Sequence, residues 1–119
     1  MTELYLTDRA LSDIDEIYRF SVERWGDEVA DEYLQDVNTA LARLTEDLSL
    51  FGTRPDYTGR LRFYRARKHV LVGDVLGGVG FVVTIWHGGM DFIDRLPRLE
   101  PMLIREVELL TARIEKANG

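Results

Sequence analysis

The stretch LSDIDEIYRFSVERWGDEVADEYLQDV, residues 11–37, sets the architecture of the N-terminal half of the chain. Apolar side chains recur every three or four residues on both sides of Gly26, which is the spacing of an amphipathic α-helix. Gly26 interrupts the pattern, and glycine readily adopts the left-handed conformation that ends a helix. A break this short predicts two helices that pack against each other as an antiparallel hairpin.

The hairpin extends beyond these residues on both sides. Thr7 or Asp8 is expected to cap the first helix, and the apolar stripe of the second continues to Leu48. A short alternating strand, residues 3–7, precedes the first helix. Residues 49–59 are rich in turn formers and predict a loop.

After the loop the apolar period changes from that of a helix to that of strands. Residues 60–68 and 70–75 predict two strands, and the pair Gly77-Gly78 predicts a tight turn into a third strand, residues 79–86. The third strand is apolar on both faces, which is typical of a central strand covered on each side.

The C-terminal part of the chain predicts helix in two pieces. Asp91 is expected to cap a short turn that Pro97 interrupts, and Pro101 fits the first position of a last helix. The element order β-α-α-β-β-β-α indicates an α+β fold whose helices pack on a sheet.

Composition restricts the class of protein. The chain has 119 residues, of which 45% are hydrophobic, which suits one compact domain with a real core. It contains no cysteine, no signal pattern at its N-terminus and no apolar run near the roughly 20 residues of a membrane span. We therefore expect a soluble cytoplasmic protein without a membrane partner.

The charge is unevenly distributed along the chain. The net charge of −6 argues against direct DNA binding, yet residues 59–69 contain no acid and five bases, here named the basic strip: Arg60, Arg62, Arg65, Arg67 and Lys68. Such a strip indicates binding to one anionic partner surface, although charge also protects exposed edge strands from aggregation. In strand geometry Arg65 and Arg67 point to the same face and can grip a carboxylate or a phosphate.

His87 ends the last predicted strand and precedes Gly88-Gly89-Met90-Asp91. A pKa near neutrality suits histidine to general acid or base catalysis, but the same residues also describe a simple turn from a strand into a helix. His69 and His87 lie too far apart in the sequence to suggest a metal site, and no phosphate-loop or nucleophile motif is present. The sequence therefore predicts no metal and no cofactor.

The hairpin and the end of the last strand together resemble the RelE/ParE superfamily, toxins of type II toxin–antitoxin systems, with the ParE branch as the nearest match. The hairpin carries the matching residues Asp13, Ile14, Ile17, Tyr18, Trp25, Gly26, Ala30 and Tyr33. The strand end matches at His87, Gly88, Met90 and Asp91. The resemblance implies a helical hairpin packed on a twisted antiparallel sheet in residues 1–97, with residues 98–119 as a helical extension of the same compact unit.

The resemblance also implies a partner, an antitoxin whose acidic C-terminal segment binds beside the hairpin or along an exposed sheet edge. Charge pairing with the antitoxin is then expected at Arg62, Arg65 and Arg67, and groove contacts at Tyr18, Val22 and Tyr33, while Trp25 is assigned to the core. ParE members inhibit DNA gyrase by binding, and the contacts with this target are expected at His87, Arg95 and Arg98.

The chain departs from the superfamily at three positions that commonly hold arginine, where it has Asp74, Thr84 and Gly89. A ribonuclease needs cations at the scissile phosphate, so these changes disfavour the alternative of a RelE-like, ribosome-dependent mRNA endoribonuclease. Its only catalytic candidate is His87. A non-toxic member kept for binding is a further alternative.

Overall fold

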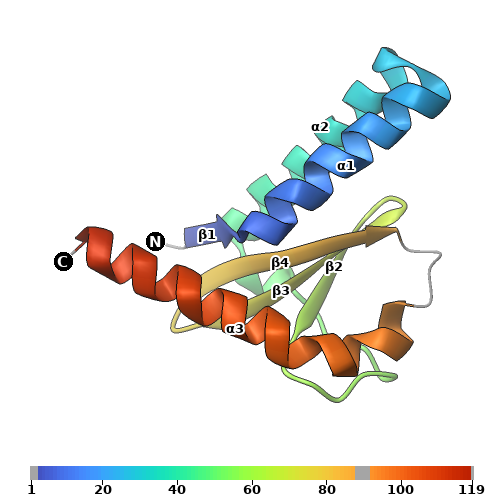
Figure 1. Ribbon diagram of the computed structural model, residues 1–119. Helices are drawn as coiled ribbons and strands as arrows, with labels where there is room; N and C mark the ends of the chain where they lie inside the picture. Colours follow the sequence, from blue (N-terminus) through green and yellow to red (C-terminus); the bar gives the residue numbers. More distant parts are fainter. Residues whose placement is uncertain (1–2, 88–91, 119) are drawn as a thin grey trace.

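The computed structural model describes residues 3–87 and 92–118 and shows the predicted order of elements (Figure 1). The hairpin consists of α1 (Asp8–Trp25) and α2 (Asp27–Glu46), followed by the short 3₁₀ helix η1 (Leu48–Leu50). The remaining elements are β1 (Glu3–Leu6), β2 (Arg62–Ala66), β3 (His69–Leu76), β4 (Val79–His87) and α3 (Phe92–Asn118). Thr7 caps α1, because its hydroxyl accepts a hydrogen bond from the Ala10 N–H at 3.2 Å.

The four strands form one sheet in the order β1-β4-β3-β2. Strand β3 is antiparallel to both β2 and β4, whereas β1 joins β4 in parallel, with Glu3 opposite Val79. The α+β class is confirmed, and the sheet is mixed. The reason is topological, since the hairpin carries the chain from one edge of the sheet to the other and leaves β1 and β4 pointing the same way.

Helices cover the sheet on both faces, as Figure 1 shows. On the hairpin side, Val37 and Leu44 of α2 pack with Leu71, Val82 and Ile85 of the sheet. On the other side α3 covers a second apolar cluster of the sheet, formed by Leu61, Phe63, Val70, Val72, Phe81 and Val83. The prediction that the last strand is covered on both faces is therefore confirmed, because β4 contributes to both clusters.

Helix α3 corrects the prediction of two helical pieces, since it runs unbroken through Pro97 and Pro101. Each proline lacks an N–H and leaves a carbonyl one turn earlier without its helical hydrogen bond. Both prolines are exposed, while Leu96 and Leu103 are 0% and 1% exposed against the sheet. Tertiary packing therefore holds the helix together where local propensity would end it.

Strand β2 is shorter than the predicted range of 60–68. Arg60 lies in a bend before the strand, and Arg67 and Lys68 form the turn into β3. The glycine turn into β4 is as predicted, with φ of +56° at Gly77 and +80° at Gly78. The basic strip thus spans a bend, a strand and a turn instead of one extended segment.

Trp25 does not lie in the core as predicted, because 51% of it is exposed. It sits at the last position of α1, and the turn of the hairpin projects away from the sheet (Figure 1). The indole packs instead against Phe20, with ring centroids 6.0 Å apart. Among the helices that the structure describes, none is long and apolar enough to cross a bilayer.

Candidate functional site

Helix α2 and the edge strand β2 enclose a groove of about 240 Å³, named here the basic groove. Its walls are formed by Asp36, Thr39, Ala40 and Arg43 from α2 and by Tyr64, Arg65, Ala66 and Arg67 from β2 and the following turn. Three guanidinium groups therefore surround a single carboxylate, that of Asp36. The excess of positive charge suits this groove to a segment that carries carboxylates.

The turn between β2 and β3 places Arg67 in the same groove as Arg65. Arg67 has a φ of +56°, a left-handed conformation that costs a residue other than glycine roughly 1 kcal/mol. In this conformation its carbonyl oxygen accepts a hydrogen bond of 2.9 Å from Nε of Arg65. Both side chains consequently line the same wall, as the sequence predicted, although only Arg65 belongs to the strand.

Asp36 and Arg67 form an ion pair at the groove without a hydrogen bond. Oδ2 of Asp36 lies 3.4 Å from Nη1 of Arg67, and this buried oxygen has no hydrogen-bond partner within the part of the chain that the structure describes. The contact is thus a long ion pair between partly exposed groups, which is weak in water. A carboxylate partner that draws Arg67 away must therefore outweigh the loss of its contact with the buried oxygen of Asp36.

The free edge of β2 lies beside the basic groove. The loop residue Gly52 pairs with Phe63 through two backbone hydrogen bonds of 2.8 Å, which cover the edge at that point. Because backbone groups alternate in direction along a strand, the N–H and C=O of Arg65 face the same edge. Beyond Gly52, no other described segment pairs with this edge, so an extended segment can add to the sheet there.

Arg62 does not join Arg65 and Arg67. Its Nη1 donates to the carbonyl oxygens of Arg60 and Leu61 at 2.7 and 3.0 Å, and it lines a separate hollow of about 360 Å³ at the other end of β2. The three arginines predicted to pair with one acidic segment therefore face two different hollows.

Arg60 is engaged within the fold, because it forms a bidentate pair with Asp74. Its Nη2 lies 2.5 Å from Oδ2 of Asp74, and its Nε lies 3.1 Å from both carboxylate oxygens. Asp74 is 1% exposed and needs this partner, since a buried carboxylate without one is costly. One of the positions that commonly holds arginine thus carries an acid that neutralises part of the basic strip.

Thr84, the second such position, is buried in β4. Its hydroxyl donates to Oδ2 of Asp13 at 2.5 Å, and the Ile85 N–H donates to the same oxygen at 3.0 Å. Asp13, one of the residues that match the superfamily, therefore ties α1 to β4. The third position, Gly89, and the predicted cap at Asp91 lie outside the described residues.

Two of the three predicted hairpin contacts, Tyr18 and Tyr33, line a narrow apolar crevice between α1 and α2, and Val22 does not. Tyr18 lines a shallow apolar groove of about 260 Å³ on the hairpin with Leu11, Ile14, Asp15 and Leu34, and its hydroxyl donates to Asp31. Val22 is half-buried and does not line this groove, while the ring of Tyr33 lies edge-on to His69 with centroids 5.5 Å apart. Tyr18 is thus the only one of the three that lines this groove.

Strand pairing brings together the two histidines that the sequence separates. His69 and His87 are cross-strand partners in β3 and β4, and their ring centroids are 5.6 Å apart. His69 is buried and His87 is exposed. Burial lowers the pKa of His69, and the nearby His87 lowers this pKa further, while Asp36 opposes the shift. In residues 3–87 and 92–118, no three acidic or histidine side chains gather as ligands for a metal.

The lowered pKa of His69 predicts a pH-dependent stability. As the pH falls through 6.5, the ordinary pKa of histidine, the unfolded chain binds the proton first, so the free energy of unfolding decreases until the pH is below the folded pKa. We expect the protein to be less stable at about pH 5.5 than at about pH 7.5. Urea unfolding at both pH values measures this difference, which His69→Gln should reduce. An equal pH dependence in wild type and variant would contradict the assignment.

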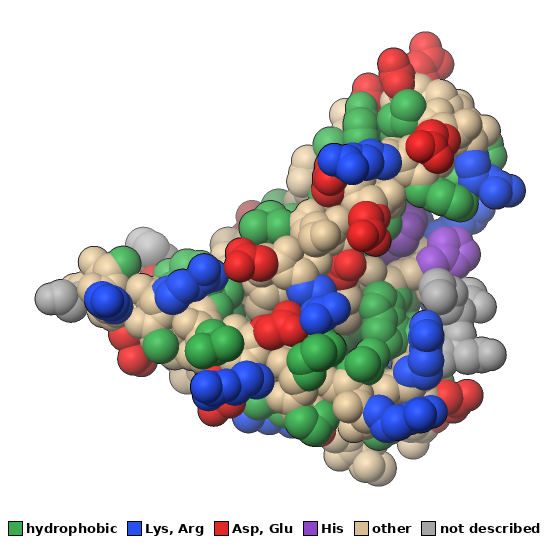
Figure 2. All heavy atoms as spheres, viewed as in Figure 1, with side chains coloured by type: hydrophobic (Ala, Val, Ile, Leu, Met, Phe, Trp, Pro, Cys, Tyr) green, Lys and Arg blue, Asp and Glu red, His purple; other side chains and the backbone are tan. Residues whose placement is uncertain are grey.

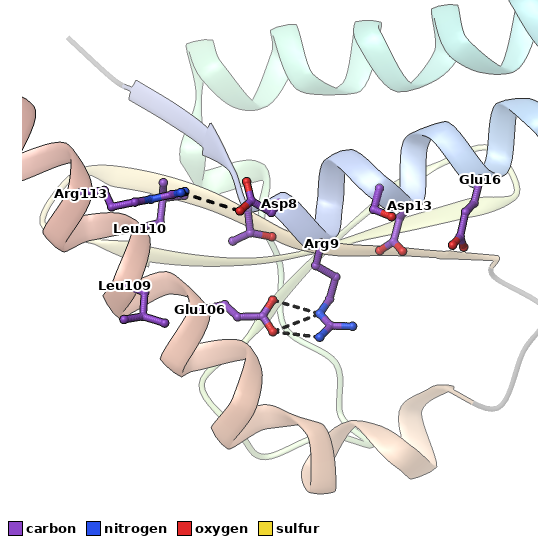
Figure 3. A pocket seen from close by; sticks show the side chains of 10 residues that line it. Asp8, Arg9, Asp13, Glu16, Glu106, Leu109, Leu110 and Arg113 are labelled. Carbon is purple, nitrogen blue, oxygen red and sulfur yellow. Dashed lines mark hydrogen bonds and ion pairs between the residues drawn. The ribbon is translucent and has the colours of Figure 1, made fainter.

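A further hollow, of about 860 Å³, lies between α1 and α3 (Figure 3). Two ion pairs cross it from one helix to the other. Nε and Nη2 of Arg9 donate to the carboxylate oxygens of Glu106 at 2.9 to 3.2 Å. Nη1 of Arg113 lies 3.8 Å from Oδ2 of Asp8. The charged groups of this hollow are therefore largely engaged with one another, and they fasten α3 to the start of α1.

Sequence reasoning missed Asp36 and Arg43, which complete the basic groove. Both lie in the predicted second helix, away from its apolar stripe. The hydrophobic pattern therefore predicts that they face solvent, but not which other residues they meet. Arg95 and Arg98, the predicted target contacts, lie exposed on α3 and not in the basic groove.

The helical hairpin packed on the four-stranded sheet has the architecture of a ParE-like fold. The family model described as "ParE toxin of type II toxin-antitoxin system, parDE" matches residues 4–92, and the chain belongs to this family. A similar solved structure is titled "Chromosomal ParDE TA system from P. aeruginosa". It is 24% identical, covers 73% of this chain and 96% of its own, and superposes with a TM-score of 0.64, which supports the fold. No curated protein matches.

Proposed function

We propose that this chain is the toxin of a type II toxin–antitoxin module, acts in the cytoplasm, and is neutralised by an antitoxin whose acidic C-terminal segment binds in the basic groove. Its toxic action is inhibition of DNA gyrase by binding, without chemistry of its own. The observation that carries the proposal is the juxtaposition of Arg43, Arg65 and Arg67 with the open edge of β2.

The groove offers an acidic segment two kinds of contact at once. Guanidinium groups bind carboxylates in bidentate fashion, and the free backbone groups of Arg65 can pair with an added strand. The chain as a whole carries a net charge of −6, so an acidic segment is repelled from most other surfaces and steered to this groove. The likeness to a structure titled as a ParDE system supports a partner of this kind.

Inhibition by binding is favoured over RNA cleavage by the positions of Asp74 and Thr84. Both side chains are buried and engaged with Arg60 and Asp13, so neither presents a group to a phosphate. A RelE-like nuclease would need other cationic side chains around His87 to bind the scissile phosphate. In addition, the negative net charge of this protein repels RNA.

Induced expression in a bacterial host tests the proposal. We expect growth arrest, preceded by a loss of negative supercoiling in a reporter plasmid, and recovery when a cognate antitoxin with an acidic C-terminal segment is co-expressed. Arrested cells with normal supercoiling would exclude gyrase as the target. Codon-dependent mRNA cuts that disappear in His87→Ala would favour the nuclease, and unimpaired growth would favour a non-toxic member.

A further inference from the structure

The outer face of α3 carries a stripe of cations interrupted by two exposed apolar side chains. At 100° per residue, one side of the helix gathers Arg95, Arg98, Met102, Arg105, Leu109, Arg113 and Lys116, which we name the α3 ridge. Its apolar members are far from buried, with exposed fractions of 42% for Met102 and 51% for Leu109. Asp94 and Glu106 flank this stripe on the helix, and Glu106 is paired with Arg9 of α1.

Most side chains of the ridge have few contacts within the fold, while the sulfur of Met102 accepts a hydrogen bond of 3.6 Å from Nη2 of Arg9 and Leu109 lines the hollow between α1 and α3. The opposite face of α3 makes the core contacts, through Leu103 and Val107. Of the five cations on the ridge, only Arg113 has an ion pair among the residues placed by the structure, at a long 3.8 Å from Asp8. A row of unpaired cations on a chain of net charge −6 is therefore available to a partner.

Helix α3 presents this ridge from a fixed position. Glu106 is gripped by Arg9 of α1 (Figure 3), and Glu100 accepts hydrogen bonds from the Arg60 N–H at 2.8 Å and from the Tyr57 hydroxyl. Leu103, between these two anchors, is 1% exposed. The ridge is thus preorganised, which lowers the entropic cost of binding along it.

The ridge is also separate from the basic groove. Helix α3 covers the sheet face opposite to the hairpin (Figure 1), whereas the basic groove lies between the hairpin helix α2 and β2. The family match ends at Phe92, where α3 begins, so the ridge lies outside the matched region. Figure 2 shows Lys and Arg side chains interspersed with hydrophobic ones along α3.

We propose that the α3 ridge docks an acidic amphipathic helix of a protein partner, independently of the segment in the basic groove. Met102 and Leu109 are seven residues apart, about 10 Å along the helix axis, so they match apolar anchors at positions i and i+7 of a helix lying alongside. Carboxylates flanking those anchors then meet Arg98 and Arg105. A nucleic acid backbone would match the cations but leave Met102 and Leu109 without a partner.

The probe for this surface is a fluorescent synthetic peptide of about three heptads, built from Glu and Ala with leucines seven residues apart. A control peptide has glutamine in place of the leucines. We expect the full chain to bind the first peptide at low salt and the control at least about tenfold more weakly. The double variant Arg98→Glu/Arg105→Glu should weaken binding roughly 30-fold, and Met102→Gln/Leu109→Gln roughly tenfold.

The variant Arg65→Glu/Arg67→Glu should bind the peptide as tightly as wild type, which separates this surface from the basic groove. All substituted side chains are exposed, and thermal unfolding followed by circular dichroism checks that each variant is folded. Three results would overturn the proposal: no peptide binding, binding lost only in the groove variant, or a DNA duplex that displaces the peptide and ignores Met102→Gln/Leu109→Gln.

Discussion

Replacing Arg65 and Arg67 by glutamate is expected to free the toxin from its antitoxin. The double variant would turn the two proposed contacts with acidic side chains into repulsions, in a groove whose described lining then keeps one cation, Arg43, beside Asp36. At roughly 1.5 kcal/mol for each partly exposed position, the affinity falls by about 100-fold or more. Titration calorimetry of the purified pair measures the loss, and growth should no longer recover on co-expression.

A control of equal charge change is available elsewhere on the surface. Arg19→Glu/Lys116→Glu alters the net charge by the same amount, but neither side chain lines the basic groove. It should change the affinity by less than about threefold at moderate salt, where distant charges are screened. Equal dissociation constants for wild type and Arg65→Glu/Arg67→Glu would show that the antitoxin binds elsewhere.

Replacing Leu103 by alanine should destabilise the whole domain. Leu103 is 1% exposed and fills the interface between α3 and the sheet, so its loss leaves a cavity and lowers the free energy of unfolding by roughly 3 kcal/mol. Urea unfolding followed by both tryptophan fluorescence and circular dichroism measures the change. One coincident transition is expected, because α3 and the sheet share one apolar cluster.

The matched control for this variant lies on the same helix. Leu109→Ala makes the same chemical change at a side chain that is 51% exposed, and should cost less than about 0.5 kcal/mol. The comparison tests the prediction that residues 98–119 form one compact unit with the rest of the chain. Equally small effects at Leu103 and Leu109 would show that α3 unfolds separately from the sheet.

The elements of the fold were predictable where a local pattern was strong. The apolar stripes on either side of Gly26 predicted α1 and α2, and the glycine pair predicted the turn into β4 with its positive φ values. Trp25 and the prolines of α3 were predicted wrongly, because burial at a hairpin end and packing on a sheet depend on what lies nearby in space. Local propensity contains neither.

The candidate site was predictable only in part. The sequence identified Arg65 and Arg67 as members of a basic strip, because a run without acids is visible in one dimension. It did not show that Asp74 neutralises Arg60, that Arg62 turns to another hollow, or that Arg43 and Asp36 complete the groove. Each of these partners comes from a different element, so sequence spacing carries no information on their distance.

By itself, the sequence determined the class of fold, the helical hairpin and a concentration of cations on an acidic chain. Those properties follow from short-range periodicity and from charge. Both belong to the sequence and do not depend on how the elements pack. The tertiary structure alone decided which cations remain available, since pairing depends on strand register and helix packing. It placed two arginines beside an open sheet edge, engaged a third with Asp74, and set a second row of cations on the outer face of α3.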